Sequence, residues 1–341
     1  MSKRGVLLMN IGTPDHPTIE SVRSYLREFL LDPDVIDIPY IIRQLLVRGI
    51  ILRVRPKKIA PRYESIWMDE GSPLRVYSMR MAKKLENEIS DIQFEVGMRY
   101  GNPSIKSALE KLRSEGVEEL LLAPLFPHHA QATTESSIKE AFLQMSKISW
   151  SPKILELGHF EDDPGFILPL AESIRPYIDD ETHLLFSYHG LPVSHIKRID
   201  KSRNHCLKSE SCCLKSTEAN TLCYSHQCHK TSISVATELG LSENQWSLSF
   251  QSRLGPAKWL EPSTLSMVEK LAEERRKLVI ASPAFLADGL ETLEELEIEA
   301  REHFLDHGGS EFHVVKCLND NSDWIRGLSG IIKSRFSSIQ N

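Results

Sequence analysis

The sequence predicts an α/β protein with two doubly wound lobes, each built on a parallel sheet flanked by helices. Eight short runs rich in Val, Ile, Leu and Phe recur along the chain without the in/out alternation of a half-exposed strand. Such runs are typical of strands buried on both faces. Segments with apolar residues three and four apart separate them, and this alternation favours parallel sheets. The runs are 5–11, 94–99, 119–125, 153–158, 182–187, 246–250, 277–282 and 311–317.

The two halves of the chain repeat one pattern. A helical segment leads into the run at 119–125 and another into the run at 277–282, and a Pro-x-Phe sequence ends or follows each run. We therefore predict Rossmann-like lobes with four-stranded sheets over 1–170 and 171–310, with a strand and helix at 311–341 packing back on them. Ligands in such folds bind beyond the carboxyl ends of the strands.

Composition excludes several classes of protein. The chain has 341 residues and a net charge of -6, which gives no reason to expect a nucleic-acid partner. No stretch approaches the roughly 18 apolar residues of a spanning helix, and the first apolar run is too short for a signal peptide. We expect a cytoplasmic protein whose six cysteines are reduced or metal-bound.

Three segments that follow apolar runs carry reactive side chains. His189, followed by Gly190, comes after the run at 182–187, and an imidazole there suits proton transfer. Taken alone, such a histidine is more often one satisfied by hydrogen bonds in a turn. Arg99 and Tyr100 come after the run at 94–99 and could bind a carboxylate or stack on a ring, although a Gly-Asn-Pro turn explains half of that segment.

The third segment is acidic. Asp288 is expected to cap a helix whose first turn contains Glu291. Glu291, Glu295 and Glu299 recur every four residues and should share one helical face. Such a row is either a solvated acidic face or a path for protons or cations.

Taken together, these motifs resemble ferrochelatases, in the family's order, from about residue 5 to about 330. The matching blocks are Val6–Pro14, Arg55–Lys58, Tyr63, Ile66–Trp67, Gly71–Leu74, Met98–Pro103, Pro124–Pro127, Ala132–Thr134, Ser187–Pro192, Gln251–Pro256, Trp259–Leu260 and Glu291–Glu295. Two positions depart from the pattern. Gly289 stands where many members have histidine. A possible partner for metal or protons is therefore missing, and Glu291 is expected to carry more of that role. Glu135 stands where glycine is usual, so the shape of the loop 128–137 is not carried over.

The resemblance implies a lyase that inserts Fe2+ into protoporphyrin IX or coproporphyrin III, with loss of two pyrrole protons, in the terminal step of haem biosynthesis. It implies that His189 takes pyrrole protons and that Glu291 faces it, both meeting the substrate iron. Glu295 and Glu299 would continue a path for protons or metal. The porphyrin-binding residues that it implies are Ile11, Arg55, Tyr63, Ser72, Arg99, Tyr100, Trp259 and Phe285. An alternative route for the metal passes Ile11, Arg99 and Tyr100. The choice of porphyrin is a separate point: position 11 carries Ile and not Tyr, which favours protoporphyrin.

The segment 37–55 is rich in Ile, Leu and Val and has no acid between residues 38 and 53. By resemblance it forms a lip over the porphyrin entrance, and its composition suits contact with a membrane surface. A buried amphipathic helix carries the same pattern. We expect peripheral association with the inner face of the cell membrane, and a monomer or a homodimer.

Five of the six cysteines lie within the stretch 203–228, of which 203–222 looks like an insertion relative to ordinary members. The thiols linked to the insertion are Cys206, Cys212, Cys213 and, directly after it, Cys223. Four thiolates suit zinc or an iron–sulfur cluster. The spacing matches neither usual zinc nor usual ferredoxin motifs. Because some ferrochelatases carry a [2Fe-2S] cluster, the resemblance favours the cluster, with Cys228 as a reserve ligand.

Two rival functions remain. One is a tetrapyrrole chelatase for cobalt or nickel, which the match of the block Gln251–Pro256 to ferrochelatases disfavours. The other is a non-enzymatic iron–sulfur or haem-binding sensor on the same scaffold. The presence of both His189 and Glu291 disfavours that function.

Overall fold

The computed structural model describes residues 2–209, 211–253 and 257–337, which form two compact units. The described residues of the first unit are 2–126, 131–158 and 328–337. Those of the second unit are 127–130, 159–209, 211–253 and 257–327. Residues 159–170, expected in the first lobe, belong to the second unit because helix α7 (Pro164–Ile174) packs on α9 (Tyr224–Leu239) there.

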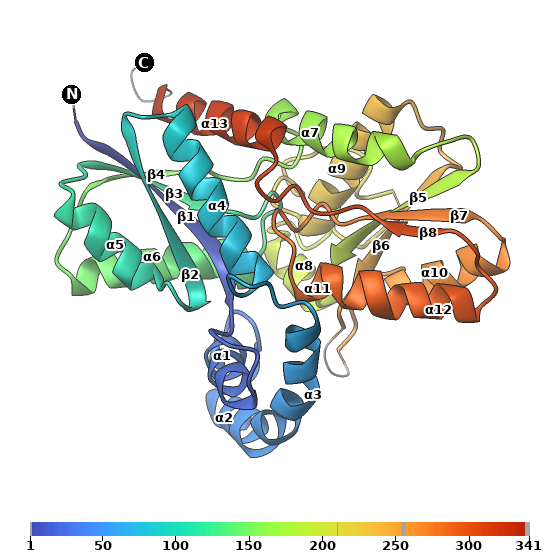
Figure 1. Cartoon of the computed structure of the whole chain (residues 1–341), viewed down its shortest axis with the longest axis horizontal. Coiled ribbons are helices and arrows are strands. Elements are labelled where there is room, and N and C mark those ends of the chain that lie inside the picture. Colours follow the sequence, from blue (N-terminus) through green and yellow to red (C-terminus); the bar gives the residue numbers. More distant parts are fainter. Residues whose placement is uncertain (1, 210, 254–256, 338–341) are drawn as a thin grey trace. The chain divides into compact units, whose positions relative to one another are not determined.

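The first unit is a four-stranded parallel sheet in the order β2-β1-β3-β4. Helix α4 covers one face of the sheet, and α5 and α6 cover the other (Figure 1). Its elements are β1 (Arg4–Thr13), α1 (Ile19–Leu31), α2 (Tyr40–Leu46), η1 (Val47–Ile51), α3 (Leu52–Ser65), α4 (Pro73–Glu88), β2 (Ile92–Gly101), α5 (Ile105–Ser114), β3 (Glu119–Pro124), η2 (Gln131–Glu135), α6 (Ser136–Lys147) and β4 (Lys153–Glu156).

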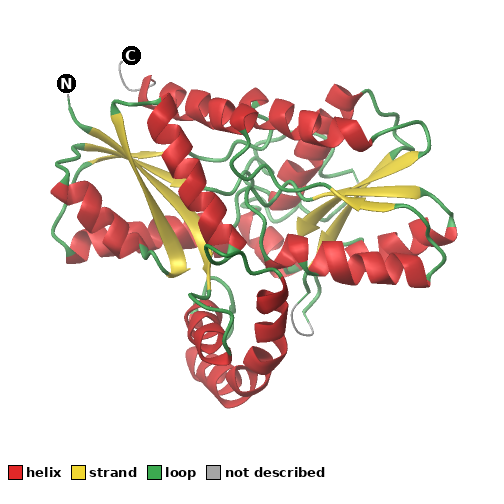
Figure 2. Ribbon diagram, viewed as in Figure 1, coloured by secondary structure: helices red, strands yellow, loops and turns green. Residues whose placement is uncertain are grey.

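The second unit repeats this topology, with the order β6-β5-β7-β8 and parallel pairing throughout. Helices α10 and α12 pack on one face of the sheet, as the ribbon in Figure 2 shows. Its further elements are η3 (Arg175–Tyr177), β5 (Thr182–His189), α8 (Val193–Ile199), β6 (Trp246–Gln251), α10 (Thr264–Glu273), β7 (Lys277–Ala281), α11 (Leu290–Leu293), η4 (Glu295–Ala300), α12 (Arg301–Asp306) and β8 (Phe312–Val314). Helix α13 (Ser322–Ser337) begins in this unit and ends in the first.

All eight predicted strands are present, and the predicted fold class is confirmed. The central strands are buried on both faces, as their composition requires: Val6, Leu7, Leu8 and Met9 of β1 are each fully buried. In each sheet the strand order reverses beside the first strand, β1 or β5. This topological switch point is where open α/β sheets bind ligands.

Three segments are π-helical: η1, η2 and η4. The second contains Glu135, the residue that departs from the family's pattern. Its carboxylate lies 3.4 Å from the ammonium of Lys139, which also pairs with Asp34 at 3.0 Å. The turn around Glu135 therefore runs directly into α6 and is tied to the loop after α1.

A buried histidine supports the strand that ends at His189. The His128 ring packs edge-on against Tyr188 of β5, with ring centroids 5.3 Å apart. Its Nε2 lies 2.8 Å from Oγ1 of Thr231, whose hydroxyl donates to the carbonyl of Glu161. Nε2 therefore carries the proton, and Nδ1 has no hydrogen-bond partner among the described residues. Because a charge there would be buried without a partner, burial lowers the pKa of His128 to about 3.

This burial predicts a pH dependence of stability. Between the pKa of unfolded histidine, about 6.5, and the folded value, the unfolded state binds more protons, so stability is lost as the pH falls. From pH 7 to pH 5 we expect His128 to lower the free energy of unfolding by up to about 2 kcal/mol. Urea denaturation at both pH values checks this. His128→Gln should reduce the loss, whereas His16→Ala, at an exposed histidine, should not; equal losses in all three proteins would contradict it.

Candidate functional site

His189 lies at the switch point of the second sheet, as the last residue of β5. Its Nδ1 is 2.7 Å from the carbonyl oxygen of Gly190. Since a carbonyl only accepts, Nδ1 carries the proton and Nε2 presents a lone pair. Burial lowers the pKa of His189, although the Gly190 carbonyl and the charge of Glu295 oppose the shift. The ring is therefore a neutral base near neutral pH.

Aromatic rings lie beside this histidine. The Phe285 ring centroid is 6.4 Å from that of His189. Gly190 donates its N–H to the carbonyl of Gln251 at 2.8 Å, and a Cβ on Gly190 would lie 2.8 Å from that oxygen and 3.3 Å from the Trp259 ring. Only glycine permits this approach. The structure thus brings the predicted residues Trp259 and Phe285 to His189.

The acidic segment is not the single helix that its spacing suggested. It consists of α11, a turn at Glu294, the π-helix η4 and then α12. The amides of both Ile298 and Glu299 bond to the carbonyl of Glu294, which widens the first π-helical turn. The three carboxylates remain close enough to interact. The charges of Glu291 and Glu299 therefore both raise the pKa of Glu295. π-Helical turns of this kind are frequent at functional sites.

Asp288 is not the helix cap that the sequence suggested. The N-cap position belongs to Gly289, and the buried Asp288 carboxylate instead accepts from the Thr292 hydroxyl at 2.9 Å. It also accepts from the Asn319 side chain at 2.6 Å and the Cys317 amide at 3.2 Å. Asp288 therefore ties the start of α11 to the segment after β8.

Two residues at the end of β6 hold the acidic segment. The Gln251 side-chain amide donates to the backbone carbonyl of Glu291 at 3.0 Å. The hydroxyl of Ser252, whose φ is 63°, donates to the Glu295 carboxylate at 2.5 Å. Burial raises the pKa of Glu291, and burial together with the Glu291 charge raises that of Glu295. Both carboxyl groups therefore hold protons at a higher pH than exposed glutamates. Sequence reasoning assigned no such role to Gln251 or Ser252.

In the first unit, Arg99 and Tyr100 are bound to an aspartate that the sequence analysis missed. Asp32 accepts from Arg99, from the Tyr100 hydroxyl at 2.8 Å and from the Ser136 hydroxyl at 2.9 Å. Burial opposes ionisation of Asp32, but hydrogen bonds from the Asp34 amide and Tyr100 and the charge of Arg99 hold its pKa below the usual value. Tyr100 is only 1% exposed, so its hydroxyl serves this network.

The other predicted porphyrin-binding residues of the first unit differ in exposure. Ser72 and Tyr63 are buried, and the Ser72 hydroxyl lies 2.7 Å from that of Thr13. Ile11, at the carboxyl end of β1, and Arg55, on α3, are half-buried. Ile11 and Arg55 are thus better placed than Tyr63 and Ser72 to touch a ligand.

The cysteine-rich loop gathers four thiols between α8 and α9. The Cys212 and Cys213 sulfurs are 3.8 Å apart, and the Cys223 thiol is within hydrogen-bonding reach of Cys206 and Cys213. A hydrogen bond with Cys223, together with burial, raises the pKa of Cys213 to about 12. Burial likewise raises the pKa of Cys206 and Cys212. Four crowded thiols are a donor set suited to a cation.

Side chains around the loop fix its backbone. The Asp200 carboxylate accepts from the amides of His205 and Cys206, each at 2.9 Å. The Asn220 side chain donates to the carbonyls of Cys212 at 3.0 Å and Lys215 at 2.9 Å. The loop therefore holds its shape through its own polar contacts.

The reserve ligand Cys228 is fully buried in α9, where it contacts Tyr224. Among the nearby histidines, His226 bonds to the Cys213 carbonyl at 2.7 Å and to Ser216 at 3.1 Å. His229 is the imidazole that hydrogen-bonds to the Cys213 thiol, which helps to raise the pKa of His229 against the effect of burial.

The segment 37–55 presents apolar side chains to solvent. It forms α2, η1 and the start of α3, which Figure 1 shows beside α1. Arg43 is buried instead, with its guanidinium donating to the carbonyls of Ile36 and Ile38, both at 3.1 Å. The helix thus turns its arginine inward and its apolar side outward, unlike a buried amphipathic helix. The exposed apolar residues are Tyr40, Ile41, Ile42, Leu45, Ile50 and Val54. Within the described ranges, no helix has the length and apolarity to cross a bilayer.

Known proteins resemble this chain closely. The family model described as Ferrochelatase matches residues 3–336. A ferrochelatase of Bdellovibrio bacteriovorus is 41% identical over 98% of this chain and 100% of its own length, and one of Pseudomonas fluorescens is 42% identical over 96% and 97%. A solved structure of SirB from Bacillus subtilis with Fe3+ has a TM-score of 0.56 at 10% identity, covering 99% of this chain and 97% of SirB. That likeness concerns the fold alone.

Proposed function

The chain belongs to the ferrochelatase family and inserts ferrous iron into a porphyrin, and for this reaction we propose that His189 is the base that removes the pyrrole protons. Each turnover exchanges one Fe2+ for two protons, so a base must be neutral before the reaction begins. The observation that carries the proposal is the protonation state of His189. Its Nδ1–H donates to the Gly190 carbonyl, so the neutral ring keeps a lone pair on Nε2 that can accept a proton.

The acidic segment provides the outlet for those protons. Glu291 and Glu295 have raised pKa values, so they accept and pass on protons at a pH where exposed glutamates stay ionised. The charge of Glu295 acts on His189, and that of Glu299 acts on Glu295. We therefore assign the route from His189 through Glu291, Glu295 and Glu299 to protons, with Glu291 also meeting the incoming iron.

Trp259 and Phe285, which lie beside His189 and Gly190, form apolar walls for the macrocycle. Arg99 is already paired with Asp32, which reduces the positive charge it offers to propionates. Coproporphyrin carries four propionates and protoporphyrin two, so this pairing favours protoporphyrin. The rival chelatases for cobalt or nickel are not supported, because the relatives at about 41% identity are ferrochelatases.

Anaerobic metallation assays test these assignments. The wild type should metallate protoporphyrin IX faster than coproporphyrin III. His189→Ala and Glu291→Gln should each lower kcat by about 10²–10⁴-fold, the usual contribution of a proton-transfer group. Glu297→Gln is a matched control, because Glu297 lies on η4, two residues beyond α11, and pairs with Arg301. Full activity in His189→Ala would refute its role as the base, and no turnover of either porphyrin would refute the function itself.

We propose that the exposed apolar side of α2, η1 and α3 rests on the inner face of the cell membrane. Six large apolar side chains are exposed between residues 40 and 54, and Arg48, Arg53, Lys57 and Lys58 are exposed on the same segments. Apolar side chains flanked by cations suit the interface of an anionic bilayer. Such a location would also suit an apolar porphyrin.

Sedimentation with vesicles of anionic phospholipid tests the membrane contact. The wild type should pellet with the vesicles. Ile41→Glu/Leu45→Glu should weaken binding at least about tenfold, because each buried apolar side chain contributes about 1.5–3 kcal/mol. Leu265→Glu/Leu305→Glu, at similarly exposed positions on α10 and beside it on α12, should bind as the wild type does. A wild type that stays entirely in the supernatant would exclude the contact.

We propose that Cys206, Cys212, Cys213 and Cys223 hold a [2Fe-2S] cluster. The gathered thiols and the polar contacts of the loop support this ligand set, and the cluster would supply a covalent brace between α8 and α9. Cys228 is the matched control, because it is equally buried but contacts Tyr224.

The metal content of protein purified anaerobically tests the cluster. Wild type and Cys228→Ser should contain about two iron atoms and two sulfides per chain, as the cluster's composition requires, with visible absorption. Cys213→Ser should lose both. If the wild type contained stoichiometric zinc and no iron, the cluster assignment would be wrong and the four thiols would form a zinc site.

A further inference from the structure

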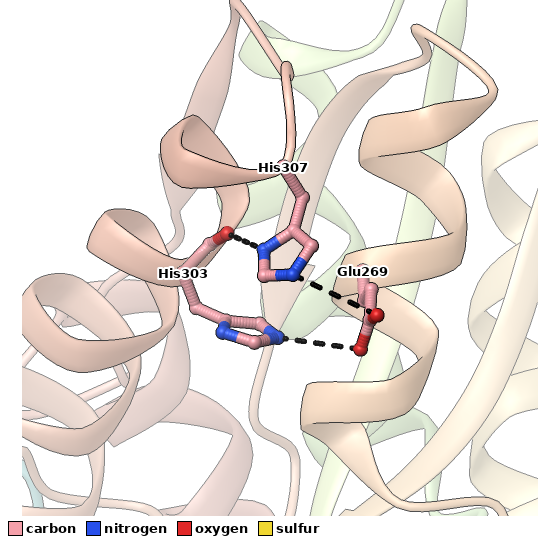
Figure 3. Close-up of side chains that lie close together, drawn as sticks. All are labelled: Glu269, His303 and His307. Carbon is pink, nitrogen blue, oxygen red and sulfur yellow. Dashed lines mark hydrogen bonds and ion pairs between the residues drawn. The ribbon is translucent and has the colours of Figure 1, made fainter.

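Two histidines at the end of α12 face one glutamate of α10, and this group lies outside the site described above. Figure 3 shows both imidazoles directed at the carboxylate. Nε2 of His303 lies 3.7 Å from one oxygen of Glu269, and Nε2 of His307 lies 3.6 Å from the other. We propose that Glu269, His303 and His307 bind a divalent transition-metal ion, distinct from the substrate iron and from the cysteine loop.

Helix geometry places the ligands. His303 and His307 are four residues apart, so their side chains share one face, and their ring centroids are 4.2 Å apart. Phe304 of the same helix is fully buried against the α10 residues Val268 and Leu271. This packing holds α12 on α10 and keeps Glu269 opposite the two rings. All three ligand residues are partly exposed, so an ion can reach them.

One nitrogen of His307 is available as a metal ligand. Its Nδ1 lies 2.7 Å from the backbone carbonyl of His303, so Nδ1 carries the proton. In the neutral ring, Nε2 therefore directs a lone pair at the Glu269 oxygen. A lone pair facing a carboxylate is unfavourable unless a cation lies between them. The carbonyl contact also fixes the ring orientation, as partners of metal-bound histidines usually do.

The two N···O distances, each to a different oxygen of Glu269, are longer than those of a hydrogen-bonded ion pair. A hydrogen-bonded imidazolium–carboxylate pair has N and O about 2.7–2.9 Å apart. Two ligands bound to zinc at about 2.0–2.1 Å in tetrahedral geometry lie about 3.3–3.4 Å apart. The observed 3.6 and 3.7 Å are closer to the second value. Two imidazoles and one carboxylate are also the ligand set of open zinc sites, which leave a fourth position to water.

Occupancy would clip the end of α12 to α10. Because α12 continues directly from η4, which carries Glu295 and Glu299, the clip would brace the acidic segment at its far end. The proposal is independent of the catalytic assignments, since none of its three ligands belongs to them.

Zinc titration of the full-length protein against a chromophoric chelator tests the site. Wild type and His16→Ala, which lacks an exposed histidine elsewhere, should bind one equivalent of Zn2+ more than His303→Ala/His307→Ala. Glu269→Gln keeps the shape of the side chain and should weaken that equivalent at least about tenfold, because loss of even an outer partner costs about 10–100-fold. Zn2+ should raise the unfolding midpoint of the wild type more than that of the double variant.

Three outcomes would overturn the proposal. One is equal zinc binding by the wild type and the double variant, which would leave Glu269 and the histidines as an ion pair. Another is loss of the extra equivalent in Cys213→Ser rather than in the double variant, which would assign it to the cysteine loop. The third is unchanged affinity in Glu269→Gln. Porphyrin metallation should persist in the double variant, which shows that it folds; if it does not fold, Glu269→Gln alone decides.

Discussion

Gln251 joins the segments that carry the proposed catalytic residues of the second unit. Its backbone carbonyl accepts from Gly190, its side-chain oxygen accepts from the Ser187 hydroxyl at 2.6 Å, and its side-chain nitrogen donates to the carbonyl of Glu291. One buried residue at the end of β6 thus uses three polar groups to position the strand that ends in His189 and the helix α11, which contains Glu291. Each of these groups is satisfied, as a buried polar network requires.

Burial shifts the reactive groups in a common direction, towards their neutral forms. It lowers the pKa of His189 and raises those of Glu291 and Glu295, and it also raises the pKa of the loop cysteines Cys206 and Cys212. A neutral imidazole can accept a proton, and crowded neutral thiols release protons when a cation binds. Exchange of protons for metal is therefore the chemistry shared by the roles proposed for His189 and for the cysteine loop.

Local irregularity recurs in segments that carry proposed roles or depart from the family's pattern. The lip segment contains the π-helix η1, the turn with Glu135 is the π-helix η2, and the acidic segment contains η4. At η4 the irregularity has a visible consequence, because the turn at Glu294 separates Glu291 from Glu295 while their charges still interact. A regular α-helix would have given the same spacing without the break that lets Ser252 reach Glu295 from the end of β6.

The sequence by itself determined the two parallel sheets, since short apolar runs that alternate with helical segments favour strands covered on both faces. The end of one such run placed His189 at the carboxyl end of a strand. The ordered motifs determined the family. Tertiary structure decided what spacing cannot encode. Asp32, distant in sequence from Arg99 and Tyr100, binds both, and Asp288 holds α11 through Asn319 instead of capping it. It also brought Glu269 to His303 and His307. Such partners are chosen by packing between helices and strands far apart along the chain, and no local pattern records that choice.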